Sequence, residues 1–214
     1  MPHDVYAPPD GPLSVLHADR HVLVLEKPAG LLTVPGRGPH LADSLASRAE
    51  ALFPGARVVH RLDRDTSGVL VMGLTVAAHR DLSLQFQKRL TDKRYAALVS
   101  GHPATASGRI ERPLAFDPDN KPRQKICYAT GRMAITDWAV VGYEGAATRM
   151  ALVPVTGRSH QLRVHMRALG HPILGDPLYG STVATPRMML HAQTLGFTHP
   201  AHGRPMQFTV PAPF

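Results

Sequence analysis

Short apolar runs bounded by turn residues dominate the hydrophobic pattern of this chain. Four consecutive apolar residues at 69–72 predict a buried strand over about 68–75. A second run, from His21 to Lys27, predicts a strand that ends at the sequence Pro-Ala-Gly. Further strand-like runs, most of them shorter, lie at 95–99, 109–110, 125–129, 134–141, 149–155, 188–197 and 206–210.

Helical patterns are fewer than strand patterns. Apolar side chains spaced by four residues predict a helix over 76–89. Asp43 or Ser44 can cap a short helix that ends near residue 52, and a third helix is expected over 160–168. Because strands outnumber helices and most connections are short, we expect an α+β fold with a largely antiparallel sheet.

Length and composition indicate how the chain is organised. With 214 residues, of which 43% are hydrophobic, it can form one large domain or two closely packed subdomains. We expect residues 1–20 to form a Pro-rich N-terminal arm, of which the first dozen residues are loose, and residues 21–214 to form the folded domain. No apolar leader segment opens the chain and no apolar run reaches membrane-spanning length. We therefore expect a cytoplasmic protein without a membrane partner.

Positive charge exceeds negative charge in this sequence. The 24 Lys and Arg residues outnumber the 16 Asp and Glu residues, which gives a formal net charge of +8. A basic protein suits a polyanionic partner such as RNA, although a net charge of this size can also serve solubility alone. Only five of the 24 cations are lysines. The others are arginines, which favour bidentate phosphate contacts and stacking on bases.

The cysteine and histidine contents do not indicate a metal site. The single cysteine, Cys127, excludes a disulfide within the chain and disfavours a cysteine-based metal site. Among the 13 histidines, His160 and His165 are five residues apart, so they do not share a helical face as an i, i+4 pair would. We therefore expect no bound metal.

The most informative segment is His-Arg-Leu-Asp-Arg-Asp-Thr-Ser-Gly at residues 60–68. It places an ionisable cluster directly before the apolar run at 69–72, which can hold one carboxylate rigidly at the rim of a sheet. Taken alone, such a segment can equally be a surface turn whose charges are solvated. The segment resembles the HRLD-x-x-TSG signature of the RluA family of RNA pseudouridine synthases. In that family the aspartate is catalytic, and it matches Asp63.

Further blocks in the family's order strengthen the resemblance, because several ordered motifs are far more specific than one. Together they extend from about residue 21 to residue 197. Gly175-Asp176-Pro177 and the nearby Tyr179 fall in one of these blocks and are expected to form a turn and a tyrosine anchor. The blocks are KPAGLLTVPGRG at 27–38, KRYAALVSG at 93–101, VTGRSHQLRVHMRALGHPILGDPLYG at 155–180 and LHA at 190–192.

The resemblance implies a fold, a reaction and a set of catalytic residues. The implied fold is α+β, with a long, curved, mostly antiparallel mixed sheet, flanking helices and a central catalytic cleft. The implied reaction converts uridine in RNA to pseudouridine, an isomerisation without redox change that needs no cofactor. The implied catalytic residues are Asp63, Tyr95 and Arg163, with Arg163 pairing with the Asp63 carboxylate. Asp63 would either attack C1′ of the sugar or remove the C2′ proton, and both routes require an ionised carboxylate.

Other residues are expected to handle the RNA. Arg61 is placed in the family to fill the gap that a uridine leaves when it exits its stack. Tyr95 would stack on the uracil, and its hydroxyl would assist removal of the C5 proton. Leu190 would form an apolar wall beside the base. Substrate contacts are expected from these further residues: His60, Arg158, Lys27 and Arg37.

The short length and the blocks VPGRG (34–38) and KPRQKICYATG (121–131) resemble one branch of the family most. That branch modifies the tRNA anticodon loop and a hairpin loop of 23S rRNA. We therefore expect tRNA and 23S rRNA stem-loops as partners of a monomer without an S4-type RNA-binding domain. The alternatives are a paralogue acting on other rRNA or tRNA uridines, an inactive basic RNA-binding domain, and a hydrolase that uses Asp63 and Asp65. The hydrolase fits poorly, because glycosidases need two separated carboxylates.

Overall fold

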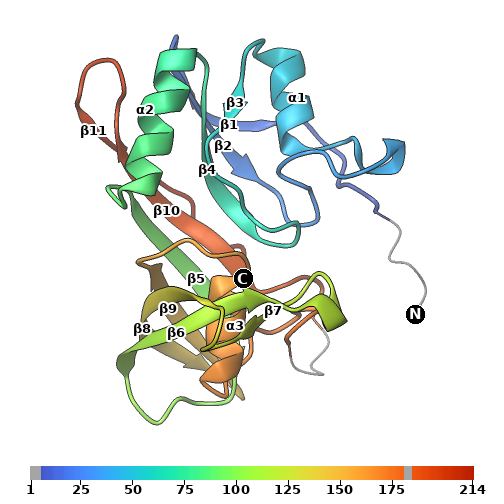
Figure 1. Cartoon of the computed structure of the whole chain (residues 1–214), viewed down its shortest axis with the longest axis vertical. Helices are drawn as coiled ribbons and strands as arrows, with labels where there is room; N and C mark the ends of the chain where they lie inside the picture. The colour runs from blue at the N-terminus through green and yellow to red at the C-terminus, as the bar shows by residue number, and fades with distance from the viewer. Residues whose placement is uncertain (1–5, 181–184) are drawn as a thin grey trace. The chain divides into compact units, whose positions relative to one another are not determined.

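The computed structural model describes residues 6–180 and 185–214 of the chain. The chain forms two compact units (Figure 1). The first unit contains the chain up to Asp92 together with Ala192–Pro213, and the second contains Lys93–His191 with Phe214. Strands β5 (Asp92–Ser100) and β10 (Leu190–Thr198) carry the chain from one unit into the other.

The first unit combines antiparallel strands with two helices. Besides part of β10, its elements are β1 (Ser14–Ala18), β2 (Val22–Lys27), α1 (Leu45–Leu52), β3 (Arg57–Val58), β4 (Ser67–Gly73), α2 (Val76–Gln87), β11 (Pro205–Thr209) and a 3-10 turn at Pro39–Leu41. β2 pairs with β1 and β4, β3 pairs with β4, and β10 pairs with β11. All seven residues of β4 are buried, as its continuous apolar run predicts. Leu82 of α2 joins the hydrophobic cluster over this strand.

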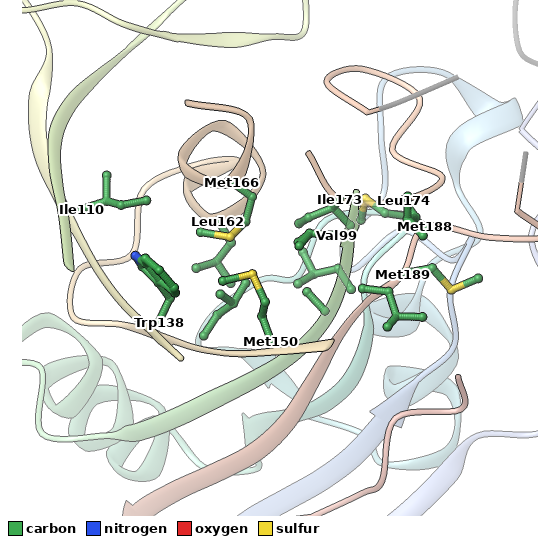
Figure 2. Close-up of a cluster of buried hydrophobic side chains, with 14 residues drawn as sticks. Val99, Ile110, Trp138, Met150, Leu162, Met166, Ile173, Leu174, Met188 and Met189 are labelled. Atoms are coloured by element: carbon green, nitrogen blue, oxygen red, sulfur yellow. The ribbon is translucent and has the colours of Figure 1, made fainter. Parts of the chain in front are cut away.

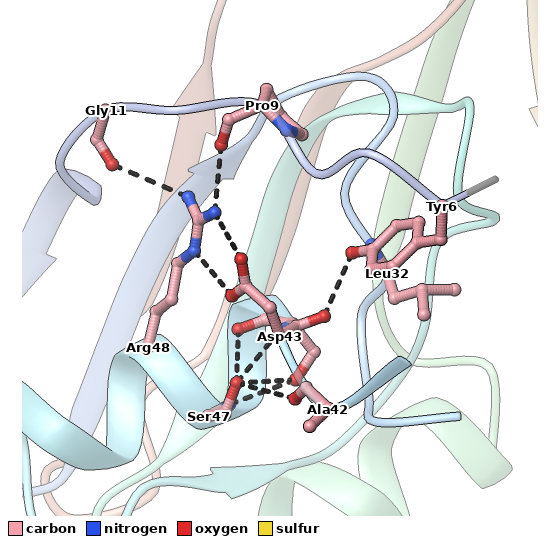
Figure 3. A network of polar contacts seen from close by, with 9 residues as sticks. Tyr6, Pro9, Gly11, Leu32, Ala42, Asp43, Ser47 and Arg48 are labelled. Atoms are coloured by element: carbon pink, nitrogen blue, oxygen red, sulfur yellow. Dashed lines mark hydrogen bonds and ion pairs between the residues drawn. The ribbon is translucent and has the colours of Figure 1, made fainter. Parts of the chain in front are cut away.

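The N-terminal segment is anchored to the first unit from Tyr6 onward (Figure 3). The Tyr6 hydroxyl donates to the Asp43 carbonyl at 2.9 Å and accepts from the Leu32 amide at 3.0 Å. Strand β1 then pairs with β2. The expectation that the first dozen residues are loose is therefore wrong from Tyr6 onward, and residues 1–5 lie outside the described residues.

The start of α1 ties the same segment down by its side chains (Figure 3). Ser44 caps the helix, as one of the two predicted candidates, and its hydroxyl accepts from the Ser47 amide at 3.1 Å. Arg48 donates to the Pro9 carbonyl at 2.9 Å and pairs with the Asp43 carboxylate at 2.7 Å. A single helix thus holds both the arm and its own N-terminal turn.

Asp19 closes the turn between β1 and β2. Its Oδ1 accepts from the amides of His21 and Val22 at 2.7 and 2.9 Å. Its Oδ2 lies 2.9 Å from Nε2 of His17 and 3.0 Å from Nε2 of His199. Burial would raise the pKa of Asp19, but these hydrogen bonds hold the pKa well below its usual range. The charged carboxylate therefore stabilises the folded state.

Replacing Asp19 with Asn is expected to lower the free energy of unfolding near neutral pH and to matter less in acid. Because the folded-state pKa lies below the unfolded value of ~3.9, the stabilisation is present above about pH 4 and is lost as the pH falls further. Urea unfolding of both proteins at about pH 6 and about pH 3 measures the effect. An equal difference at the two pH values would assign the loss to geometry instead of charge.

The second unit is a five-stranded antiparallel arrangement with one helix. Besides β5, its elements are β6 (Ser107–Phe116), β7 (Gln124–Ile126), β8 (Arg132–Glu144), β9 (Ala147–Pro154), α3 (Gln161–Ala168) and a 3-10 turn at Pro118–Asn120. The strand order is β5-β9-β8-β6-β7. Every pairing within it is antiparallel.

Helix α3 packs onto this sheet through its apolar face (Figure 2). Leu162 and Met166 point from the helix toward Met150 of β9, with Trp138 of β8 nearby in the same cluster. Burying each large apolar side chain contributes about 1.5–3 kcal/mol. The helix that carries Arg163 is therefore fixed by the core of its own unit.

The structure confirms the α+β class and the mostly antiparallel pairing, and it lengthens some predicted strands. β6 extends over Ser107–Phe116 although the sequence pattern indicates only 109–110, because charged side chains occupy its exposed face. The pattern also missed β1, in which no residue is fully buried. The central cleft remains a prediction. Within the described ranges, no helix combines the length and apolar character needed to cross a bilayer.

Candidate active site

The signature segment forms a tight turn directly before β4. The Thr66 amide donates to the Asp63 carbonyl at 3.1 Å, which closes the turn, and the Asp63 side chain is half-buried. Thr33 holds the preceding residue from both sides. Its hydroxyl donates to the Leu62 carbonyl at 2.7 Å and accepts from the Leu62 amide at 3.2 Å. Asp63 therefore lies between a clamped backbone and the first residues of a buried strand.

Lys27 fixes the other end of the turn. Its ammonium group is fully buried and donates to the carbonyls of Pro28, Leu31 and Arg64 at 2.9, 2.7 and 2.8 Å. The Gly30 amide also donates to the Arg64 carbonyl, at 2.9 Å. An ammonium group has three N–H donors, and here each has a carbonyl acceptor. The expectation that Lys27 contacts a phosphate is therefore wrong, and its contacts instead hold the loop after β2 against the turn.

Gly68 at the end of the signature is required by a close approach of two strands. Its φ is +120°, and a Cβ atom there would lie 2.2 Å from the Ala192 carbonyl oxygen. No side chain can be accommodated against that backbone atom, so the glycine lets β4 begin beside Ala192 of β10.

The second acidic residue of the signature is held by its neighbour. Arg64 Nε donates to one carboxylate oxygen of Asp65 at 2.8 Å, and Arg64 Nη2 donates to the other at 3.3 Å. Both oxygens of Asp65 are thus engaged by a guanidinium. This arrangement disfavours the hydrolase alternative, in which Asp65 would act beside Asp63 as a catalytic carboxylate.

Two of the predicted RNA contacts in the first unit are open to solvent. Arg61 and Arg37 are both exposed, and neither makes a hydrogen bond or ion pair with any residue that the structure describes. His60 differs, because its Nε2 accepts from the Val71 amide at 3.2 Å and its ring stacks on Phe86 at 4.2 Å between centroids. His60 thus has a structural role at the start of the signature, and its contact with substrate remains a prediction.

In the second unit, Arg163 forms a buried fork with Asp176. Its Nε and Nη2 each donate to one carboxylate oxygen at 2.7 Å, and the two side chains are 3% and 0% exposed. Burial would raise the pKa of Asp176, but the Arg163 guanidinium and the amides of Leu178 and Tyr179 lower it. The Arg163 guanidinium also lies over the Tyr179 ring, 5.1 Å from its centroid. The pairing of Arg163 with Asp63 remains a prediction.

The turn and the tyrosine anchor expected in this block are present, but no pattern in the sequence pairs Asp176 with Arg163. The two residues are 13 positions apart, on a helix and in a loop. The one feature of the sequence that links them is that both lie within the same family block, 155–180. Gly180 completes the turn, since a Cβ atom there would lie 2.4 Å from the Asp176 carbonyl oxygen.

Tyr95 and Leu190 share one hydrophobic cluster. Tyr95 of β5 is half-buried and packs against the cluster that contains Leu190, which is 2% exposed. An apolar wall next to an aromatic ring is the environment that the sequence predicts for the uracil base. Arg158 is half-buried, and its Nε donates to the Met133 carbonyl at 3.3 Å. Its contact with phosphate remains a prediction.

No group of three or more His, Cys, Asp or Glu side chains that could hold a metal ion occurs within 6–180 and 185–214. Within the signature, Arg64 pairs with Asp65 and His60 accepts from the Val71 amide.

Comparison with known proteins decides the family. Residues 21–168 match the family model described as RNA pseudouridylate synthase, which is more than half of the chain. This chain belongs to the RNA pseudouridylate synthase family. It is accordingly an isomerase that acts on RNA, and the matched range includes the HRLD segment at 60–63.

Relatives in this family match over nearly the whole chain. The dual-specificity RNA pseudouridine synthase RluA of Escherichia coli O6:H1 is 52% identical over 98% of both chains. The enzyme of the same name from Pasteurella multocida is 45% identical, again over 98% of both chains. Among solved structures, human RNA pseudouridylate synthase domain containing 1 is 32% identical with a TM-score of 0.78, covering 100% of this chain and 87% of that one.

Proposed function

We propose that this synthase converts uridine to pseudouridine in short stem-loops of both tRNA and 23S rRNA, with Asp63 as its catalytic residue. The observation that carries the proposal is the 52% identity over 98% of both chains to a relative named as dual-specificity. The protein acts as a monomer in the cytoplasm and needs no cofactor, because the reaction is an isomerisation. The N1–C1′ bond of the uridine breaks, a C5–C1′ bond forms, and the C5 proton is lost as N1 gains one.

Asp63 is proposed to act at the sugar. As the N1–C1′ bond breaks, C1′ becomes electron-poor, and a carboxylate there either adds to C1′ or removes the C2′ proton. Both routes need an oxygen held rigidly next to the sugar. The turn closed by the Thr66 amide and clamped at Leu62 by Thr33 supplies that rigidity in the first unit.

The RNA contacts are proposed from the family resemblance, together with exposure for Arg61 and Arg37. Arg61 is exposed and directly precedes Leu62-Asp63, so its side chain can occupy the space left by a uridine that has exited its stack. Arg37 and Arg158 are proposed to contact phosphates, and His60 to contact the substrate from the start of the signature. Leu190 is proposed to pack against the base.

Replacing Tyr95 with Phe is expected to preserve the fold and base stacking but to slow catalysis about 10²-fold, the usual scale for a lost proton-transfer group. The ring keeps its place against the cluster that contains Leu190 and only the hydroxyl is removed. Single-turnover measurement on a saturating stem-loop gives the rate of the chemical steps. An unchanged rate would contradict a proton-transfer role and leave Tyr95 with stacking alone.

Isolated stem-loops of both kinds are expected to be sufficient substrates. The 214 residues of this chain offer a limited surface, so they recognise a compact loop through backbone shape and a few splayed bases. The test supplies a tRNA anticodon stem-loop and a 23S rRNA hairpin as short transcripts and maps pseudouridine at single-nucleotide resolution.

The matched control for this test is each transcript with the target uridine replaced by cytidine, which should release no C5 tritium. Modification of only one wild-type transcript would make this chain a single-specificity relative. Activity on neither transcript, with activity on intact ribosomal particles, would overturn the stem-loop proposal. Binding without product in every substrate would favour the alternative of an inactive RNA-binding domain.

A further inference from the structure

The second unit has a cavity that is lined by none of the residues proposed above for catalysis or RNA contact. It has a volume of about 420 Å³ and lies between the 3-10 turn at Pro118–Asn120, strand β7, the last turns of α3 and Tyr179. Small-molecule sites typically measure ~300–1,000 Å³, so this cavity is large enough for one nucleotide and too small for a helix.

The only acidic side chain among the lining residues is already neutralised. Asp117 accepts from Asn120 Nδ2 and from Lys125 Nζ, each at 3.0 Å. The hydrogen bond from Asn120 lowers the pKa of Asp117 most, and the one from Lys125 lowers it further. The carboxylate is therefore charged and paired near neutral pH. It therefore does not attract a further cation into the cavity.

Two arginines leave the lining with excess positive charge. Arg123 precedes β7 and Arg167 lies in the last turn of α3, and both line the cavity. Neither guanidinium donates a hydrogen bond or forms an ion pair with any residue in the described part of the chain. Two forked donors without an internal acceptor match the planar, bidentate geometry by which arginine binds phosphate oxygens.

Tyr179, which also lines the cavity, is linked by hydrogen bonds to the residues around Arg163. The Tyr179 hydroxyl accepts from the Gln124 amide at 2.6 Å and lies 2.7 Å from His160 Nδ1. The Tyr179 amide donates to the Asp176 carboxylate, which also accepts from the Arg163 guanidinium. A ligand resting on Tyr179 is thus held by the same network that positions a residue proposed for catalysis.

The segment around the cavity has the composition of a single-stranded RNA contact. Residues 121–132 contain four Lys or Arg residues and no Asp or Glu. Tyr128 follows β7 by two residues and is 75% exposed, an unusual exposure for an aromatic side chain. Cationic side chains combined with an exposed ring bind splayed nucleotides, because the ring stacks on any base while the cations track the backbone.

We propose that this cavity binds one nucleotide of the RNA substrate other than the uridine to be modified, with its phosphate against Arg123 and Arg167. The proposal rests on the function proposed above and adds a second point of RNA recognition to it. An RNA loop is then held at two separate nucleotides, the target and one neighbour. Such two-point holding distinguishes a loop that can splay two bases from a loop that can splay only one.

The test is the double variant R123Q/R167Q, with R57Q/R80Q as a matched control that removes the same charge from exposed residues of the first unit. The cavity variant is expected to raise KM for a stem-loop about tenfold at physiological salt and leave kcat nearly unchanged, because phosphate contacts contribute uniform binding. It should also flatten the slope of log K against log salt by about one, and the control should do neither. Thermal unfolding checks that both variants fold.

A second measurement assigns the phosphate. Uncharged methylphosphonate linkages are placed one at a time along the stem-loop, and binding is measured for the wild type and for R123Q/R167Q. One linkage near the target is expected to weaken binding to the wild type and to have no further effect on the variant. Equal losses in both proteins at every linkage, or the same KM for the cavity variant and the control, would overturn the proposal.

Inorganic phosphate distinguishes a free anion from the RNA backbone. Phosphate that stabilises the wild type at low millimolar concentration and not R123Q/R167Q, with no effect of the variant on RNA binding, would reassign the cavity to a free anion and overturn the RNA proposal. Wild-type activity on the stem-loops is measured in parallel. If the wild type binds them without modifying them, the proposed function fails while the cavity is still tested by binding.

Discussion

Replacing Asp63 with Asn is expected to abolish product formation while RNA binding persists. Asn keeps the shape of the side chain but removes the charge that C1′ or the C2′ proton requires. Removing such a group typically costs about 10²–10⁴-fold, so turnover should fall below about one percent of the wild type. Release of C5 tritium from a labelled stem-loop measures turnover, and filter binding of the same RNA measures affinity.

The matched control is Asp65→Asn, which makes the same change two residues away in the same turn. Asp65 is paired with Arg64, so its loss should cost only the modest stability of a partly exposed ion pair and leave turnover near the wild type. The Asn variant of Asp63 must be freshly prepared and checked for deamidation, which would restore the carboxylate. Retention of more than a few percent of turnover in an undeamidated sample would show that Asp63 is not the catalytic carboxylate.

Replacing Asp176 with Asn is expected to cost the second unit about 3 kcal/mol or more of stability. Removing one partner of a buried ion pair typically costs ~3–5 kcal/mol, since the other charge stays buried without that partner. Asp176 and Arg163 are 0% and 3% exposed at the side chain, so solvent cannot replace the lost interaction. Activity should fall as well, because Arg163 loses the fork that orients it. Chemical denaturation and turnover on a stem-loop measure the two effects.

The double variant R163M/D176N separates the two effects. It removes both charges and retains an oxygen that can accept from the amides of Leu178 and Tyr179, so stability should recover in part. Activity should not recover if Arg163 orients the Asp63 carboxylate. Recovery of both would reduce Arg163 to a structural residue. A loss below about 1 kcal/mol in D176N would contradict the buried-pair interpretation.

The acid dependence of the same pair has a defined sign. The pKa of Asp176 is lowered in the folded state, so its contribution to stability is complete above the unfolded value of ~3.9 and is lost as the pH falls below it. The stability difference between the wild type and D176N should therefore shrink in acid.

The class of fold, the family and the candidate catalytic carboxylate could all be predicted from the sequence alone. The run at 69–72 predicted β4 because a strand buried on both faces must be apolar at every position. Ser44 could be predicted as a cap of α1, because a short polar side chain before a helix accepts from the unpaired amides of the first turn. The HRLD segment identified Asp63, since its order of residue types is specific to one family.

The partner of each buried or half-buried charged side chain is known only from the fold. Lys27 is a residue type that often contacts phosphate. In the structure its ammonium group is buried and donates to backbone carbonyls, one of them that of Arg64, 37 residues away. Asp176 pairs with Arg163 of α3, and Asp19 pairs with His17 and with His199, which is 180 residues away. β1 was missed because its side chains are not fully buried, so the apolar period is weak. Local sequence records propensity and pattern, whereas the pairing of a charge depends on chain segments that meet only in the fold.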